Sequence, residues 1–339
     1  MKRIRTCLTG ALALVLAAAA VAEEAITLYS HRHYESDQEL FQRFTDETGI
    51  EVKVVKASAD ELVERLKAEG DNSPADILVA ADAGRLQRAK AAGLLQPIES
   101  EALVRRIPAS YRDPDNTWFG FALRARVLAY APDRVDASEL SSYEALADPQ
   151  WRGRLLVRSS PNIYNQSLLA SIIAARGEEE AQAWAAAIRK NMARPPQGSD
   201  RDQMRAVAAG LGDVAIVNTY YVGLLANSSN AKDRQVAESL QLFFPNQDGR
   251  GTHVNVSGAG LTRSSKNPQA ATRFLEFLAS DEAQASFTQT TYEYPVVADI
   301  PWSELQRSWG AFEIDALHLS SLGDLNAAAV KAFNRAGWE

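Results

Sequence analysis

Hydrophobic positions in the first part of the chain follow two different periods, which indicates β-strands alternating with helices. Short apolar runs are separated by segments in which apolar residues recur every three to four positions. The expected strands cover 25–30, 50–54 and 76–80, and the expected helices cover 35–48, 59–69 and 82–92. Gly49, Gly70 and Gly93 follow the three helical segments, where glycine commonly ends a helix. This order is typical of βαβαβ units with a parallel sheet.

Two longer extended segments, 118–132 and 252–261, stand out from the short strands. Between and after them the same periodicities predict further elements. The expected strands are 155–157, 213–217 and 240–244, and the expected helices are 166–176, 178–191, 200–209, 267–278, 281–287 and 315–333. A long strand can cross from one domain to the next, so two of them indicate a two-segment hinge. We therefore expect an α/β chain with a first domain of 23–125 plus 252–300 and a second of 126–251 plus 301–339.

The N-terminal residues predict export. Lys2, Arg3 and Arg5 precede an apolar run over 11–21, and Ala20-Val21-Ala22 has the pattern of a cleavage site. These features are those of a secretory signal peptide over 1–22, so the mature chain is expected to begin at Glu23. Cys7 is the only cysteine, so export would leave no thiol for disulfides, zinc thiolates or a cysteine nucleophile.

Charge and hydropathy narrow the choice of partners. The net charge is −7, and no basic stripe of the kind that nucleic acid or anionic lipid requires is present. Beyond the signal, no stretch approaches the roughly 18 apolar residues that a membrane span needs. We therefore expect no nucleic-acid binding and no membrane insertion of the mature chain, and a small ligand or a protein partner instead.

The candidate chemistry begins at Tyr220 and Tyr221. They follow the predicted strand 213–217, and Thr219 can cap a helix in which both phenols fall in the first turn. Ligands bind beyond the carboxyl ends of strands in open α/β sheets. The alternative is that the two rings only pack in the core.

Two other strand ends also carry tyrosine. The segment YSHRHYESD over 29–37 brings His31, His33 and Tyr34 to the turn after the first strand, and Tyr164 follows the strand at 155–157. In a two-domain protein these turns could face Tyr220 and Tyr221 across a cleft. The alternative is that the histidines are solvated loop residues.

At these residues the chain resembles the ferric-ion-binding periplasmic proteins of bacterial ABC iron-uptake systems, in particular the group that holds iron with one histidine and four tyrosines and no bound anion. The segments that carry the resemblance are YSHRHYESD, NIYNQS and GDVAIVNTYYVG. The resemblance implies a type II, transferrin-lobe-like periplasmic binding protein with a two-strand hinge and a central cleft. It also implies the metal ligands His33, Tyr34, Tyr164, Tyr220 and Tyr221.

The resemblance further implies a periplasmic monomer that is not an enzyme and delivers Fe(III) to an ABC permease driven by its ATPase. It gives Arg124 the role of a cation beside the tyrosines. Arg124 and Arg126 lie two positions apart on one extended segment, so they project from the same face. The alternative is that both pair with surface carboxylates.

The coordination chemistry of Fe³⁺ supports tyrosine ligands independently of the family resemblance. Fe³⁺ prefers anionic oxygen, and a bound cation drives the proton from a phenol whose ordinary pKa is near 10. Four phenolates around a 3+ ion leave one net negative charge, which a nearby cation would balance.

Other residues and other functions remain open. Tyr292 and Tyr294 are interpreted as packing residues, and His253 and His318 as histidines without a metal. A binder of an oxyanion or a small organic cation on the same fold would leave most of the tyrosines unused. A secreted hydrolase could use His33 with Glu35 or Asp37, but no nucleophile is evident. Adding ferric citrate distinguishes the iron-binding function from these two alternatives, because only phenolate bound to Fe³⁺ would give an absorption band in the visible range.

Overall fold

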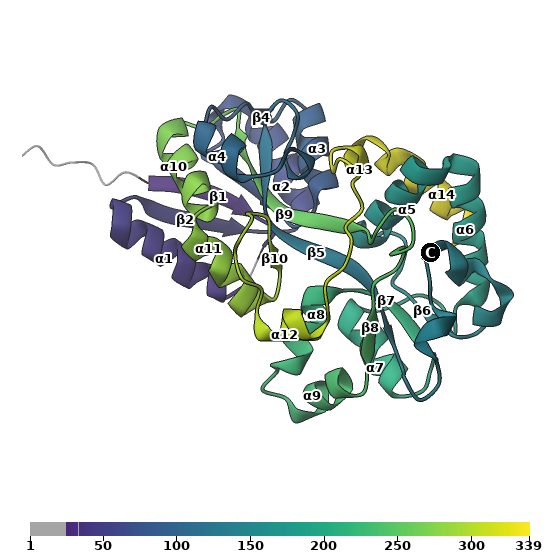
Figure 1. Cartoon of the computed structure of the whole chain (residues 1–339). Coiled ribbons are helices and arrows are strands. Elements are labelled where there is room, and N and C mark those ends of the chain that lie inside the picture. Colours follow the sequence, from purple (N-terminus) through teal and green to yellow (C-terminus); the bar gives the residue numbers. More distant parts are fainter. Residues whose placement is uncertain (1–24, 33) are drawn as a thin grey trace, which may run out of the picture.

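The computed structural model describes residues 25–32 and 34–339, so the predicted signal peptide and His33 lie outside the described residues. In the described part, ten strands form one hydrogen-bonded sheet (Figure 1). The strands are β1 Ala25–Ser30, β2 Glu51–Lys56, β3 Ile77–Ala80, β4 Leu95–Gln96, β5 Trp118–Tyr130, β6 Leu155–Leu156, β7 Val214–Asn218, β8 Gln241–Phe243, β9 Val254–Thr262 and β10 Tyr294–Pro295.

The first strands confirm the predicted parallel arrangement. Strand β1 pairs in parallel with both β2 and β3, and helices connect them. The full order is β2-β1-β3-β9-β5-β7-β6, with β10 and β8 on β5 and β4 on β9. All four residues of β3 are buried, as expected for a central strand covered on both faces.

Strand β5 joins the two halves of the molecule. Its residues from 118 to 125 pair with β9, whereas its residues from 126 to 130 pair with β7. All thirteen residues of β5 and all nine of β9 are buried. At Gly258 on β9 an added Cβ would lie 2.6 Å from the carbonyl oxygen of Phe119, so glycine lets the two strands approach closely. The two long extended segments of the sequence are therefore confirmed as the strands β5 and β9, and β5 pairs with strands at both ends of the sheet.

Helices cover the sheet in two groups (Figure 1). Helices α1, α2, α3 and α10 flank the end of the sheet that carries β2, β1 and β3, and α5, α6, α7 and α14 flank the end that carries β7 and β6. The helices are α1 Ser36–Thr48, α2 Ala59–Glu69, α3 Ala83–Ala91, α4 Glu101–Arg106, α5 Ile163–Arg176, α6 Glu178–Asn191, α7 Asp200–Ala208, α8 Thr219–Ala226, α9 Ala231–Glu238, α10 Pro268–Leu278, α11 Asp281–Ser286, α12 Glu304–Ser308, α13 Ser321–Asp324 and α14 Asn326–Ala336. Helix α13 contacts both α3 and α5, so it bridges the two groups.

The prediction of one helix over 315–333 is wrong. The chain first pairs Ile314 with Thr252 in a β-bridge, and the helices α13 and α14 begin only later. The side chain of Asp315 accepts a hydrogen bond of 3.1 Å from the backbone of Leu317 and pairs with Arg250. These tertiary and local bonds satisfy the segment without a helix.

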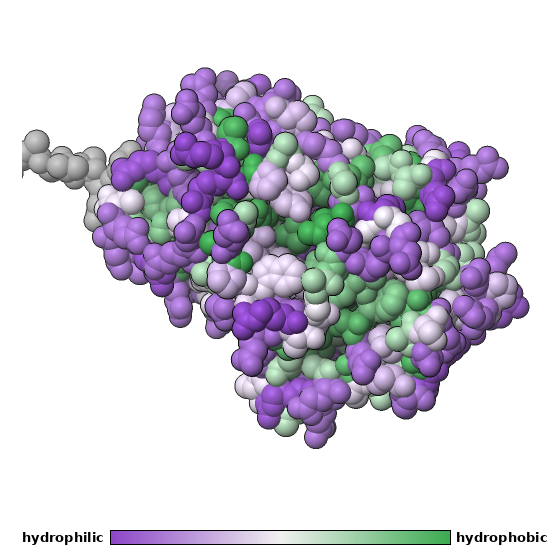
Figure 2. All heavy atoms as spheres, viewed as in Figure 1, coloured by the Kyte–Doolittle hydropathy of each residue, from purple (hydrophilic) through white to green (hydrophobic). Residues whose placement is uncertain are grey.

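The hydrophobic core is continuous across both ends of the sheet. The packing of α1 on α10 illustrates it: the rings of Phe44 and Phe274 meet edge to face with their centroids 5.1 Å apart. Figure 2 shows hydrophilic residues over most of the periphery of one face, with hydrophobic residues gathered toward its middle. None of the helices in the described part is long and apolar enough to cross a membrane.

Candidate functional site

Tyr220 and Tyr221 lie in the first turn of α8, directly after β7, as the sequence predicts. The helix begins at Thr219 itself, whose hydroxyl accepts a hydrogen bond of 3.3 Å from the backbone N–H of Ala125 on β5. This bond attaches the start of the helix to the shared strand. The two rings lie 4.1 Å apart between centroids with 32° between their planes, so both phenols are held together.

Tyr164 lies in the first turn of α5, where it meets Tyr220. The side chain of Asn162 accepts a hydrogen bond of 3.2 Å from the backbone N–H of Tyr164, so the helix is capped there and begins at Ile163. The expected start near Gln166 is therefore too late. The hydroxyl of Tyr164 lies 3.2 Å from the hydroxyl of Tyr220, which brings the oxygen atoms of two predicted ligands within hydrogen-bond distance.

Tyr34 reaches the same place from the other half of the molecule. It lies between β1 and α1, and its ring meets that of Tyr220 edge to face with the centroids 6.3 Å apart. The structure thus brings together all four tyrosines that the sequence proposes. The fifth proposed ligand, His33, lies outside the described residues. The neighbouring His31 has its Nε2 atom 3.3 Å from the guanidinium of Arg85.

Burial raises the pKa of the phenols of Tyr34, Tyr220 and Tyr221 above their ordinary value near 10. Desolvation of the charged form is the largest cause, and the surrounding acidic groups add to it because a phenolate repels other negative charges. Without a metal the phenols are therefore neutral. A cation placed among them would reverse this preference and drive the protons off.

Guanidinium groups surround the tyrosine rings. In the described part of the chain, five arginines hold their Cζ atom within 6.0 Å of the centroid of one of these rings. The pairs are Arg32 over Tyr34 at 4.6 Å, Arg124, Arg158 and Arg126 over Tyr164 at 5.2, 5.8 and 6.0 Å, and Arg201 over Tyr221 at 5.7 Å. Such contacts favour electron-rich rings, and above all phenolates.

Arg124 and Arg126 do not pair with surface carboxylates, so that alternative is wrong. Both arginines are buried on β5, because this strand runs through the middle of the sheet. Arg126 forms an ion pair of 2.8 Å with Asp200, and a nitrogen of Arg124 lies 3.8 Å from a carboxylate oxygen of Glu293. Both carboxylates are buried as well. Both guanidinium groups lie against the ring of Tyr164, with their Cζ atoms 5.2 and 6.0 Å from its centroid.

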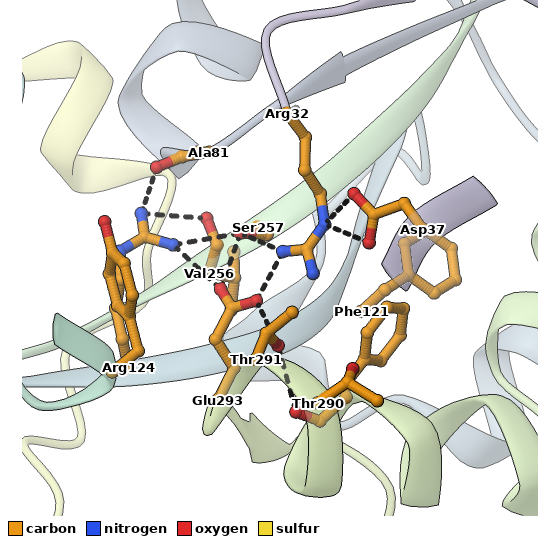
Figure 3. Close-up of polar contacts among 12 residues, drawn as sticks. Arg32, Asp37, Ala81, Phe121, Arg124, Val256, Ser257, Thr290, Thr291 and Glu293 are labelled. Atoms are coloured by element: carbon orange, nitrogen blue, oxygen red, sulfur yellow. Dashed lines mark hydrogen bonds and ion pairs between the residues drawn. The ribbon is translucent and has the colours of Figure 1, made fainter. Parts of the chain in front are cut away.

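Sequence reasoning missed Arg32 and Glu293. The interpretation of Tyr294 as a packing residue is confirmed, since its ring lies 4.7 Å from that of Trp302. Glu293 precedes it, is 1% exposed, and lies between Arg32 and Arg124 (Figure 3). The sequence does contain one indication of Glu293: its carboxylate stands between Tyr292 and Tyr294, in a segment whose other residues are typical of a buried strand.

A buried aspartate, Asp82, joins the two halves near the site. It caps α3, and its Oδ2 atom accepts hydrogen bonds of 2.8 Å from the hydroxyl of Ser167 on α5 and from the amide of Asn255 on β9. One carboxylate thus contacts both halves and one of the long strands between them.

The other histidines do not form a metal site. His253 is buried and its pKa is lowered, first by burial and then by the nearby arginines, and Nδ1 of His318 lies 2.8 Å from the hydroxyl of Ser320. Across residues 25–32 and 34–339, no group of three or more histidine, cysteine, aspartate and glutamate side chains could hold a metal ion. The tyrosine cluster is therefore the candidate site.

The α/β fold and the cluster of ligand-type side chains together define a solute-binding protein, and comparison with known families agrees. Residues 72–310 match the family described as bacterial extracellular solute-binding protein, and the chain belongs to that family.

Its relatives carry more specific names. It is 49% identical over 317 residues to iron uptake protein A1 of Synechocystis sp., which covers 94% of this chain and 88% of the relative. A Trichodesmium protein solved in complex with iron and citrate ligands superposes with a TM-score of 0.90 and 49% identity, covering 93% of this chain and 100% of that one. The ferric binding protein from Campylobacter jejuni superposes with a TM-score of 0.89 and 44% identity, covering 93% and 100%. The Synechocystis and Campylobacter proteins bear the names of an uptake protein and a binding protein, and the predicted α/β fold and family are confirmed.

Proposed function

We propose that this chain captures Fe(III) after export and delivers it to an ABC permease with its ATPase. The ligands are Tyr34, Tyr164, Tyr220 and Tyr221, with His33 as the fifth. The observation that carries the proposal is the convergence of these phenols: the hydroxyls of Tyr164 and Tyr220 lie 3.2 Å apart, with the other two rings against Tyr220.

The chemistry of the site suits a trivalent ion. Phenolates are hard, anionic oxygen donors, which Fe³⁺ prefers. Four phenolates and Fe³⁺ carry one net negative charge. The cationic groups beside the rings, Arg124 first among them, balance this charge and stabilise the deprotonated ligands.

The position of the site supports capture between two domains. We assign 23–125 plus 252–300 to one domain and 126–251 plus 301–339 to the other, with β5 and β9 as the hinge. Tyr34 then comes from the first domain, and Tyr164, Tyr220 and Tyr221 from the second. The signal peptide over 1–22 directs the chain to the periplasm, where it acts as a monomer. Two names among the relatives, an iron uptake protein and a ferric binding protein, support the choice of iron.

Visible spectroscopy tests the proposal. Mixed with ferric citrate, the protein is expected to develop a phenolate-to-iron charge-transfer band, which neither an oxyanion binder nor a hydrolase would show. Tyr220→Phe and Tyr221→Phe keep the ring volume and remove the oxygen, so each should weaken the band and lower ferric affinity by at least tenfold, since a lost metal bond exceeds the roughly 1.4 kcal/mol of that factor.

The matched control is Tyr130→Phe. This change also removes one hydroxyl with a hydrogen bond, the 2.7 Å bond to Gln241, but leaves the four clustered tyrosines intact. It should leave the band unchanged. If both site variants keep the full band and affinity of the wild type, the tyrosine pair only packs and the proposal fails.

A further inference from the structure

Glu293 forms the centre of a buried charge cluster between Arg32 and Arg124 (Figure 3). Its Oε2 atom accepts a hydrogen bond from Nη1 of Arg32, and its Oε1 atom lies 3.8 Å from Nη1 of Arg124. Arg32 also holds Asp37 at 2.9 Å. The side chains of all four residues are at most 8% exposed, so water screens these charges little.

Ser257 on β9 organises the cluster. Its hydroxyl accepts hydrogen bonds of 3.2 Å from both Arg32 and Arg124 and donates one of 2.8 Å to Oε1 of Glu293. Thr291 donates a further bond of 3.1 Å to Oε2 of Glu293. The carboxylate is therefore held in one position between the two guanidinium groups. Burial raises the pKa of Glu293, but Arg32 and Arg124 outweigh burial and lower it, so the carboxylate is charged.

The same two arginines lie against two tyrosines of the site. The Cζ atom of Arg32 lies 4.6 Å from the ring centroid of Tyr34, and that of Arg124 lies 5.2 Å from the ring centroid of Tyr164. Glu293 thus contacts both guanidinium groups that lie against these rings. The segment before β10 is in this way connected to the segment after β1 and to the shared strand β5.

We propose that Glu293 is a positioning residue that aims Arg32 and Arg124 at the tyrosines and sets the net charge beside the phenolates, thereby limiting how firmly the site holds iron. This inference rests on the proposed function. Two arginines and the carboxylates of Asp37 and Glu293 make the cluster neutral. Without the charge of Glu293 the cluster becomes positive by one, and that charge attracts the net negative iron site.

The consequence is that Glu293 keeps the ion releasable. A positive charge beside the phenolates lowers the energy of their electrons, so the charge-transfer band should move to shorter wavelength. The added positive charge should also slow the transfer of iron to a chelator by roughly tenfold, as expected for one buried charge at an effective dielectric constant of about 20. A protein that delivers iron must release it, so the negative charge of Glu293, which speeds iron release, suits that role.

Glu293→Gln is the direct test, because the amide keeps the size of the side chain and removes the charge. Ferric wild type and variant are compared by the position of the visible band and by the rate of iron transfer to excess chelator. We expect a shorter wavelength and a transfer about tenfold slower. Glu282→Gln, which removes an exposed carboxylate paired with Arg43, is the control and should change neither quantity. A Glu293→Gln variant with the band and rate of the wild type overturns the inference.

A second set of variants tests the inference if Glu293→Gln alone does not fold. Arg124→Gln makes the cluster negative by one, so its band should move to longer wavelength and its iron should leave faster. Combining it with Glu293→Gln restores neutrality, and band and rate should return toward the wild type. A double variant that matches Arg124→Gln overturns the inference. A wild type without any band would instead contradict the proposed function.

Discussion

At the scale of single residues, the protonation state of the tyrosine side chains controls iron binding. Burial raises the pKa of the phenols of Tyr34, Tyr220 and Tyr221, so the metal-free protein keeps them protonated at neutral pH. A ferric ion binds phenolate rather than phenol, and each ligand must therefore lose its proton when the ion enters. Protons favour the empty site and iron favours the deprotonated one.

Iron binding should therefore weaken steeply on acidification. Each proton released adds one unit to the slope of the logarithm of the affinity against pH, so four phenol ligands predict a slope of about 4. The measurement is a competition with a chelator of known pH dependence between about pH 5 and 8. Tyr221→Phe should lower the slope by about one. A wild-type slope below one would mean that the phenols stay protonated and are not ligands.

At the scale of elements, the site depends on contacts between helices of the two halves. The carboxylate of Asp82 at the start of α3 accepts a hydrogen bond of 2.8 Å from Ser167 on α5. Asp82 is fully buried, and burial raises its pKa, while Arg124, Arg85 and the hydrogen bond from Ser167 act in the opposite direction and favour the carboxylate. The bond exists only while α3 and α5 lie together, so it stabilises the closed arrangement.

Ser167→Ala should make the closed form less stable. The lost hydrogen bond to a charged group is worth about 1.5 to 3 kcal/mol, so ferric iron should dissociate roughly tenfold faster or more in stopped-flow transfer to a chelator. Ser171→Ala, on the same helix, removes a buried hydroxyl that donates to Leu168 at 2.7 Å and accepts from Arg250 at 3.3 Å; neither bond reaches α3, so the rate should stay unchanged. Equal rates for Ser167→Ala and the wild type would show that this bond does not hold the halves together.

At the scale of the whole molecule, capture requires the two halves to close on one ion. Tyr34 lies beside β1, whereas Tyr164 and Tyr220 lie beside β6 and β7 at the other end of the sheet, and β5 pairs with strands of both ends. If these tyrosines bind one ion, as proposed, they can reach it only when the halves are together, so we expect iron to shift the population toward a closed form.

Small-angle X-ray scattering should show this closure. We expect a smaller radius of gyration for the ferric protein than for the metal-free protein, because the hinge strands allow the halves to separate once the ion is absent. The variant that combines Tyr220→Phe with Tyr221→Phe should keep the larger radius when iron is added. An identical radius for wild type with and without iron would contradict a closure driven by the metal.

Local chemistry alone was enough to predict most of the elements and the tyrosine positions. The strand 25–30 and the helix 59–69 agree with β1 and α2 residue for residue, because apolar periodicity and a helix-ending glycine act within a few positions of the chain. Tyr220 and Tyr221 could be placed at a strand end for the same reason. Where the sequence misplaced an element, as over 315–333, a contact with Thr252 and Arg250 replaces the helix.

Only the tertiary structure determined which buried charged residues form ion pairs and hydrogen bonds with one another. Arg32 and Glu293 lie 261 positions apart in the chain, and Asp82 and Asn255 lie 173 apart, so no local pattern connects them. The sequence by itself therefore determined the α/β elements and the four tyrosines, whose signals are local. The pairing of Glu293 with two arginines, and of Asp82 with Ser167, depends on how the sheet brings distant segments together, because a buried charge is stable only beside partners that the fold supplies.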